Sequence, residues 1–307
     1  MPITIDDLRR HAVARSLFSP TTLNRALHRM GFVQADPIRA PARAQDLILR
    51  HRVKDYRAGD LERRYTKLGV DEDFFINYGF VTRTLQSHMH PRSDSSAPPE
   101  GRLPWPAARR KRAELLLDFV RQRGVVHPQE VDDHFSHGEP GFTASRAARG
   151  RDPSVHRAPA PTRPSRRCHA ERSDRRARRC RGPRLRPLPA PSLRLLVRRL
   201  RFATPQWQLQ LTGALRRAQD RLTHAEVDGL DWFWPAGEDP ERSAPPDTVR
   251  LLAPFDPVVW DRARFERLWG WVYRFEAYTP ALKRKRGYYA LPLLWRDRVI
   301  GWSNLSG

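Results

Sequence analysis

Cysteine is scarce in this 307-residue chain, and its scarcity excludes two kinds of architecture. Only Cys168 and Cys180 occur, so cysteine can build neither a disulfide framework nor a four-cysteine zinc site. Two histidine pairs with metal-like spacing lack acidic or cysteine partners nearby, namely His88 with His90 and His134 with His137. We therefore expect no metal and no cofactor.

Long hydrophobic runs are also missing. No apolar stretch approaches the ~20 residues that a membrane-spanning helix needs. The first residues, Met1 to Thr4 followed by Asp6 and Asp7, lack the basic and then apolar order of a signal peptide. We expect a cytoplasmic protein with no membrane contact and no obligate protein partner.

Lysine is rare among otherwise abundant cations. The 57 Lys and Arg residues include only five lysines and face 34 Asp and Glu residues, for a net charge of +23. Such an excess favours a polyanionic partner, because binding to phosphates releases condensed counterions. The preference for arginine is also typical of a GC-rich coding sequence, so charge alone only suggests a nucleic acid.

Helical spacing dominates the first part of the chain. Thr4 and Asp7 form an approximate capping box for a helix that continues to Phe18. Ser19 and Pro20 then open a second helix, for which Gly31 is a good C-terminal residue. The next segment, 32–37, is predicted to be short and extended because Pro37 disfavours a helical conformation at Asp36.

The remaining elements follow from hydrophobic periodicity. A proline-rich linker at 91–106 separates a domain at 1–90 from a helix, short strand and helix at 107–138. Further helices are expected at 40–51 and 71–89, and another at 206–224 within a helical segment at 187–248. A β-rich module is expected at 249–307, with strands at 271–278, 288–295 and 298–302.

The segment 139–186 differs from the rest. It holds 15 arginines, no lysine and four acidic residues, and its only large apolar side chains are Phe142, Val155 and Leu185. Such a stretch cannot bury a core and is expected to be disordered. It is typical either of an arginine-rich nucleic-acid arm or of an out-of-frame part of a GC-rich gene, and the second interpretation explains its abrupt edges better.

Several segments together resemble one known family. They are Gln34-Ala35-Asp36 with the following residues to Arg43, Asp228 to Pro235, Leu252 to Arg262, and Tyr278 to Tyr289. They resemble the AlkZ/YcaQ family of bacterial winged-helix DNA glycosylases, which unhook interstrand crosslinks, over about 1–137 and 187–305. The resemblance implies a mainly α fold with some β structure, in which tandem winged-helix (helix-turn-helix) domains precede a β-rich C-terminal module. The family continues beyond residue 307 and has a second recognition helix and wing where 139–186 stands, so we expect a truncated module and question the activity of this chain.

The resemblance identifies Gln34 and Asp36 as the catalytic residues of a monofunctional glycosylase acting on alkylated or crosslinked purines. Breaking an N-glycosidic bond builds positive charge on the sugar, which a carboxylate such as Asp36 can stabilise, or it can deprotonate the incoming water. Gln34 lies two positions earlier on an extended segment, so we expect both side chains on one side, with the amide orienting that water. On the motif alone, Asp36 would be read as a turn residue before Pro37.

Two groups of cations are the expected contacts with double-stranded DNA, which would make the protein nucleoid-associated. Arg39 and Arg43 are expected on one face of the helix at 40–51, and the run Lys283, Arg284, Lys285 and Arg286 is expected in a loop between two strands. Each could equally be an ordinary surface charge. A carboxylate pair of Asp256 and Asp261 is expected to be structural. The alternatives to an enzyme are a non-enzymatic winged-helix regulator and an inactive, degraded homologue.

Overall fold

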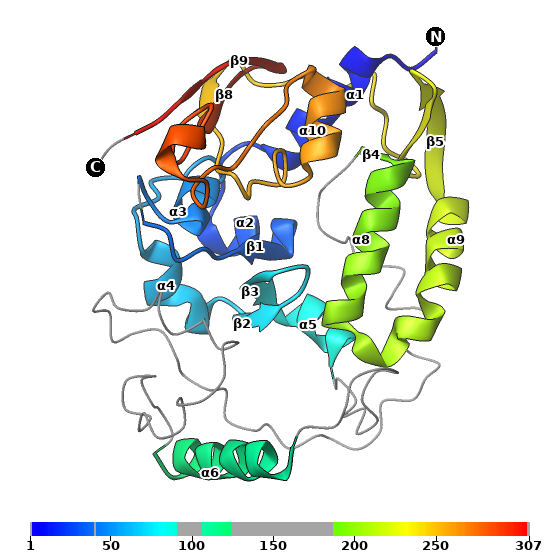
Figure 1. Ribbon diagram of the computed structural model, residues 1–307. Helices are drawn as coiled ribbons and strands as arrows, with labels where there is room; N and C mark the ends of the chain where they lie inside the picture. The colour runs from blue at the N-terminus through cyan, green and yellow to red at the C-terminus, as the bar shows by residue number, and fades with distance from the viewer. Residues whose placement is uncertain (1, 40, 91–105, 124–186, 306–307) are drawn as a thin grey trace. The chain divides into compact units, whose positions relative to one another are not determined.

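The computed structural model describes residues 2–39, 41–90, 106–123 and 187–305 (Figure 1). The chain divides into two compact units, one made of 1–93 with 181–307 and the other of 94–180. Within the second unit, helix α6 (Ala107–Arg123) is the described element. The first unit is a mixed α and β structure with small antiparallel sheets. The expected features at 91–105 and 124–186 lie outside the described residues.

The N-terminal part of the first unit begins with two capped helices. The Thr4 side chain accepts a hydrogen bond from Asp7 N–H, and the Asp7 carboxylate accepts one from Thr4 N–H, which confirms the capping box. The second helix begins later than expected, with Thr22 rather than Ser19 as its N-cap, and ends at Gly31 with φ 76° as expected. The elements of this part are α1 (Ile5–Ser16), α2 (Leu23–Met30), β1 (Phe32–Gln34), α3 (Ala44–Leu49), α4 (Asp60–Arg64), η1 (Tyr65–Lys67), β2 (Val70–Phe74), β3 (Tyr78–Thr82) and α5 (Arg83–Met89).

A single helix was expected at 71–89, and this was wrong. The segment forms the antiparallel hairpin β2–β3, and only its last turns, in α5, are helical. The aromatic and β-branched residues of this segment fit the spacing of a helix as well as that of a strand. The pairing of β3 with β1 stabilises the strand conformation. The first sheet therefore has the order β1-β3-β2.

The stretch from 188 to 235 repeats that sheet order. Its elements are β4 (Leu188–Pro189), α8 (Ala190–Ala203), η4 (Pro205–Gln210), α9 (Leu211–Arg221), β5 (Leu222–Val227) and β6 (Leu230–Pro235), and its sheet has the order β4-β6-β5. Figure 1 shows α8 and α9 side by side. The helix expected at 206–224 is the 3-10 segment η4 followed by α9, which ends at Arg221 because residues 222–227 pair with β6 as strand β5. Asp228 and Gly229 adopt positive φ and make the tight turn between the two strands.

A third antiparallel sheet forms the C-terminal part, in the order β7-β8-β9. Two of the expected strands are present, but 271–278 is not a strand, because its rings and Glu276 make side-chain contacts in place of a backbone ladder. The elements here are β7 (Val249–Leu251), α10 (Arg262–Trp269), η5 (Ala281–Lys283), β8 (Leu291–Trp295) and β9 (Arg298–Ser303). None of the helices in the described ranges could cross a membrane.

Helix α1 joins the C-terminal elements to the core. Val13 and Leu17 are buried against Leu252 and neighbouring residues, and Leu8 is buried in a cluster with Trp232. The Asp261 side chain caps α10 by accepting a hydrogen bond from Arg264 N–H, which fits the structural role expected for it.

A buried ion pair links the two ends of the chain. Arg52 and Asp256 have fully buried side chains, and two hydrogen bonds of 2.8 and 3.0 Å join guanidinium and carboxylate. Arg52 also donates to the carbonyl oxygens of Ser16 and Ile48, and Asp256 accepts from Val258 N–H. Each charge is satisfied only while the other segment is in place, so Asp256 is structural, as expected.

We predict that Asp256→Ala lowers the free energy of unfolding by about 3–5 kcal/mol, because it leaves the Arg52 charge buried without its counterion. Urea unfolding followed by circular dichroism measures the loss. The matched control is Asp247→Ala, which breaks the exposed 2.7 Å pair with Arg296 and should leave the unfolding midpoint nearly unchanged. Equal effects of the two variants would contradict the prediction.

Candidate active site

The Gln34-Ala35-Asp36 segment lies at the end of β1. Gln34 pairs with Gly79 of β3, and Ala35 N–H donates to the Tyr78 carbonyl oxygen at 3.1 Å. A Cβ atom at Gly79 would lie 2.8 Å from Gln34 Cα, and closer still to the Val33 carbonyl oxygen. Glycine is therefore required opposite Gln34, because any side chain would push β1 away.

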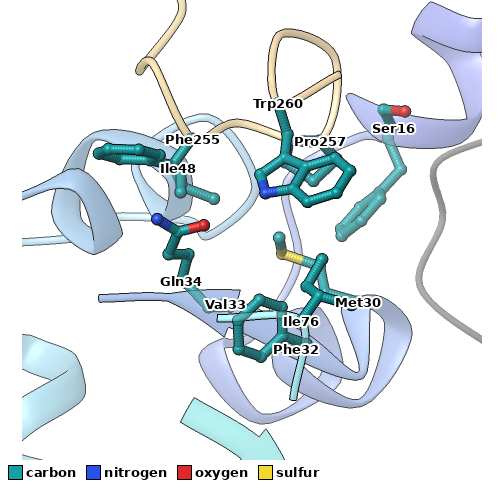
Figure 2. Close-up of a pocket in the computed structure, with 11 residues that line it drawn as sticks. Ser16, Met30, Phe32, Val33, Gln34, Ile48, Ile76, Phe255, Pro257 and Trp260 are labelled. Atoms are coloured by element: carbon teal, nitrogen blue, oxygen red, sulfur yellow. The ribbon is translucent and has the colours of Figure 1, made fainter. Parts of the chain in front are cut away.

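The Gln34 side chain points into the interior. It is 5% exposed and borders a cavity of about 30 Å³, where Figure 2 shows its amide directed toward Phe255 and Trp260. The amide oxygen Oε1 has no hydrogen-bond partner among the described residues. A buried acceptor left unpaired is costly, and a cavity of this size accommodates one water molecule.

The Asp36 carboxylate is partly exposed, unlike Gln34. Its Oδ1 accepts a 2.9 Å hydrogen bond from Ile38 N–H, and its own N–H donates to Gln45 Oε1 at 3.3 Å. Gln45 in turn donates to Glu62 at 2.7 Å. Burial raises the pKa of the Asp36 carboxyl above its ordinary value, and the hydrogen bond from Ile38 offsets part of that rise.

Two tyrosines of the C-terminal part are affected by the charge of Asp36. Burial raises the pKa of Tyr289, and the nearby negative charge of Asp36 raises it further; the same two causes act on the pKa of Tyr278. The Phe275 ring contacts both tyrosines, with centroid distances of 5.3 Å to Tyr289 and 6.0 Å to Tyr278. Ala35 packs against the same buried cluster, which includes Tyr289. Sequence reasoning did not assign these tyrosines to the site, although both lie in a segment that carries the family resemblance.

The two arginines that follow the motif occupy different environments. Arg39 is exposed in a non-helical segment, and α3 begins only at Ala44, so the expected shared helical face with Arg43 is wrong. Arg43 lies 3.1 Å from Asp46 and 3.2 Å from Glu62, with a side chain 20% exposed. Its charge is engaged inside the network that holds Gln45.

The basic run divides in the same way. Lys283 and Lys285 are exposed, whereas Arg284 and Arg286 are partly buried. Arg284 donates to the Thr279 carbonyl oxygen at 2.8 Å, and Arg286 donates to a backbone carbonyl at 3.1 Å. The run follows a non-strand segment and precedes β8, so it does not lie between two strands as expected.

Two of the described histidines outside this site have hydrogen-bond partners in the protein. His90 Nε2 lies 2.8 Å from an Asp73 carboxylate oxygen, and His51 Nε2 lies 2.7 Å from the Leu251 carbonyl oxygen. Burial lowers the pKa of His51 to about 4. Within the described residues, no three His, Cys, Asp or Glu side chains converge as a metal site. His134 and His137 lie outside the described residues.

Comparison with known proteins gives one family match. The model of the family described as "DNA glycosylase AlkZ-like" matches residues 27–307, which include the Gln34-Ala35-Asp36 segment and all of the C-terminal part. No solved structure matches the chain.

We predict that Gly79→Ala lowers the free energy of unfolding by about 1–3 kcal/mol, because the added methyl group overlaps the β1 backbone. Urea unfolding measures this, and hydrogen exchange should show faster exchange at the Ala35 amide. The control is Gly213→Ala in α9, where the new Cβ meets only the flexible end of Arg217 and alanine favours the helix. A Gly79 variant as stable as wild type would show that β1 is not constrained there.

Proposed function

The chain belongs to the AlkZ-like DNA glycosylase family, and we propose that it is a monofunctional enzyme that hydrolyses the N-glycosidic bond of alkylated or crosslinked purines in DNA. The family is one of DNA repair glycosylases, which implies DNA as the partner and hydrolysis of an N-glycosyl bond as the reaction. The observation that carries the residue assignment is the half-buried Asp36 carboxylate, whose charge raises the pKa of two tyrosines and which lies on the segment that carries the family resemblance.

The proposed reaction uses the charge already on the damaged base. When the C1′–N9 bond of an N7-alkylguanine breaks, its electron pair neutralises the cationic purine and positive charge develops on the sugar. Asp36 stabilises that charge at short range. Because the carboxylate is partly desolvated, its negative charge acts more strongly than it would in bulk water. Water then bonds to C1′, and its proton passes to the Asp36 carboxylate or to solvent. Because the leaving group needs no protonation, a sparse site suffices.

Gln34 serves this reaction through water. Its unpaired Oε1 would accept a hydrogen bond from a water molecule in the adjoining cavity, and the amide would orient such a molecule. Gln45 is a positioning residue, because it holds the backbone of Asp36 and is itself held by Glu62.

Two winged-helix units are inferred from element order. From α2 to β3 the chain runs helix, strand, two helices and two strands, with the sheet order first, third, second. The stretch from β4 to β6 repeats this order without the leading helix: a strand, then helices, then two strands, with the same sheet order. On this inference the second recognition helix and wing lie at 211–235, after the arginine-rich segment and not within it.

Exposed cations beside the site are the proposed phosphate contacts. Arg39, Lys283 and Lys285 are exposed, so they can pair with phosphates without breaking an internal bond. Arg43 and Arg286 are committed to the protein, and we assign them to positioning.

We predict that Asp36→Asn slows release of N7-methylguanine from duplex DNA by about 100-fold or more, while DNA affinity is retained or slightly raised. Release is measured by alkaline cleavage of the abasic product, and affinity by fluorescence anisotropy. The control Asp239→Asn removes an exposed carboxylate elsewhere and should behave as wild type. Wild-type protein that binds DNA without forming abasic sites would identify a non-enzymatic DNA-binding protein, and equal release by the Asp36 variant would reject the residue assignment.

The pH dependence follows from the direction of the Asp36 pKa shift. The carboxylate must be ionised to act, and its raised pKa means that ionisation is lost at a higher pH than usual on acidification. We predict that the single-turnover rate falls as pH is lowered, with a midpoint above the ordinary aspartate pKa of about 3.9. N7-methylguanine is a suitable substrate because its positive charge is permanent. A rate that stays constant to pH 4 in folded protein would contradict the prediction.

A further inference from the structure

A leucine beside the candidate site is fully exposed. Leu282 has a relative exposure of 101% and occupies the centre of the short turn η5, while Tyr278, four residues earlier, is 79% exposed. A single exposed apolar side chain is unremarkable on a protein surface. Leu282 differs because the loop that carries it is held rigidly and follows Tyr278, whose pKa is raised by the charge of Asp36.

The rigidity comes from a carboxylate beneath the loop. Glu276 is 4% exposed, and its oxygens accept hydrogen bonds from the N–H groups of Lys285 at 3.0 Å and Arg286 at 2.7 Å. These hydrogen bonds, with a further one from Gly287 N–H, hold the pKa of Glu276 below its ordinary value. The loop therefore closes around a buried anion.

Side chains of the loop add to this hold. The Arg286 guanidinium contacts two adjacent indole rings, 4.1 Å from the Trp271 centroid and 4.7 Å from that of Trp302. Asn304 donates to the Arg286 carbonyl oxygen, and a Cβ atom at Gly287, which has φ 107°, would lie 2.5 Å from the Asn304 side chain. These contacts fix the loop while leaving the Leu282 side chain free of neighbours.

Ring contacts join the loop to the cluster against which Ala35 packs. Tyr278, which precedes η5, packs on Phe275, which contacts Tyr289 in the cluster that Ala35 joins. Lys283 and Lys285, on either side of Arg284, are exposed. An apolar side chain with flanking cations, beside a carboxylate that acts on a sugar, is complementary to a DNA duplex at the damaged nucleotide.

We propose that Leu282 is a wedge that enters the duplex between base pairs and unstacks the damaged nucleotide, so that its sugar reaches Asp36. This rests on the proposed function. Apolar wedges of this kind act by burying an exposed side chain between bases, and nearby cations bind the phosphates of the distorted strand. Lys283 and Lys285 have that role here, and Tyr278 faces the opened step.

The test separates unstacking from chemistry. The probe is a duplex with 2-aminopurine beside a 2′-fluoro N7-methylguanine, whose glycosidic bond resists hydrolysis. Binding of wild-type protein should raise 2-aminopurine fluorescence because the probe base unstacks. Leu282→Ala should abolish most of that rise, and on cleavable DNA it should slow base release about tenfold by removing part of the unstacking energy.

Matched variants make the result specific. Leu209→Ala removes a leucine that is 93% exposed in η4 and should leave fluorescence and rate unchanged. Leu282→Met should restore the rise, since it keeps an apolar side chain of similar volume. Lys283→Ala should weaken DNA binding and lower the salt dependence of the affinity by about one phosphate contact. At saturating protein it should leave the rise in 2-aminopurine fluorescence unchanged.

The outcomes distinguish this proposal from the function on which it rests. Asp36→Asn should unstack the probe fully, and a wild-type protein that unstacks the probe through Leu282 yet releases no base would reject only the proposed reaction. Base release with the same fluorescence rise in wild type and Leu282→Ala would overturn the wedge. So would a Leu282 variant that changes self-association in sedimentation but not fluorescence, because the leucine would then serve a protein contact.

Discussion

The ion pair between Arg52 and Asp256 joins positions 204 residues apart, in a place from which water is excluded. A guanidinium and a carboxylate in such surroundings have only each other and the backbone as partners, so either charge alone would be expelled. Arg52 further ties the end of α1 to α3 through the Ser16 and Ile48 carbonyl oxygens. The C-terminal part is thereby held against the N-terminal part, where Ala35 packs on the cluster that includes Tyr289.

The candidate site consists of parts that neither end of the chain supplies alone. The N-terminal sheet gives Asp36 its backbone geometry, through the close approach at Gly79 and the hydrogen bond from Asp36 N–H to Gln45. The C-terminal part supplies Phe275 and Tyr289, which belong to the apolar cluster against which Ala35, the residue before Asp36, packs. A carboxylate that is partly buried yet still reachable is suited to act on a developing sugar cation, because solvent screens it less.

Charge in this protein has two uses that composition does not distinguish. In the basic loop, exposed Lys283 and Lys285 alternate with Arg284 and Arg286, which bind carbonyl oxygens and aromatic rings of the protein. Arginine suits the internal positions because its planar, weakly hydrated guanidinium stacks on rings and donates to several acceptors, whereas lysine remains strongly hydrated at the surface. The number of cations therefore overstates the number available to phosphates.

The local features could be predicted from the order of the residues alone: the capping box at Thr4, the C-terminal glycine of α2, the extended segment before Pro37 and the motifs that identify the family. Each depends on residues within a few positions of one another, where sterics and backbone hydrogen bonds act without help from the rest of the fold. Long-range contacts, in contrast, make 71–89 fold mainly as a hairpin, keep 271–278 from forming a strand, and leave Gln34 pointing inward while Asp36 stays accessible. Strand pairing and desolvation depend on groups distant in the chain, as the β1–β3 pairing and the tyrosines near Asp36 illustrate, so a local pattern carries no record of them.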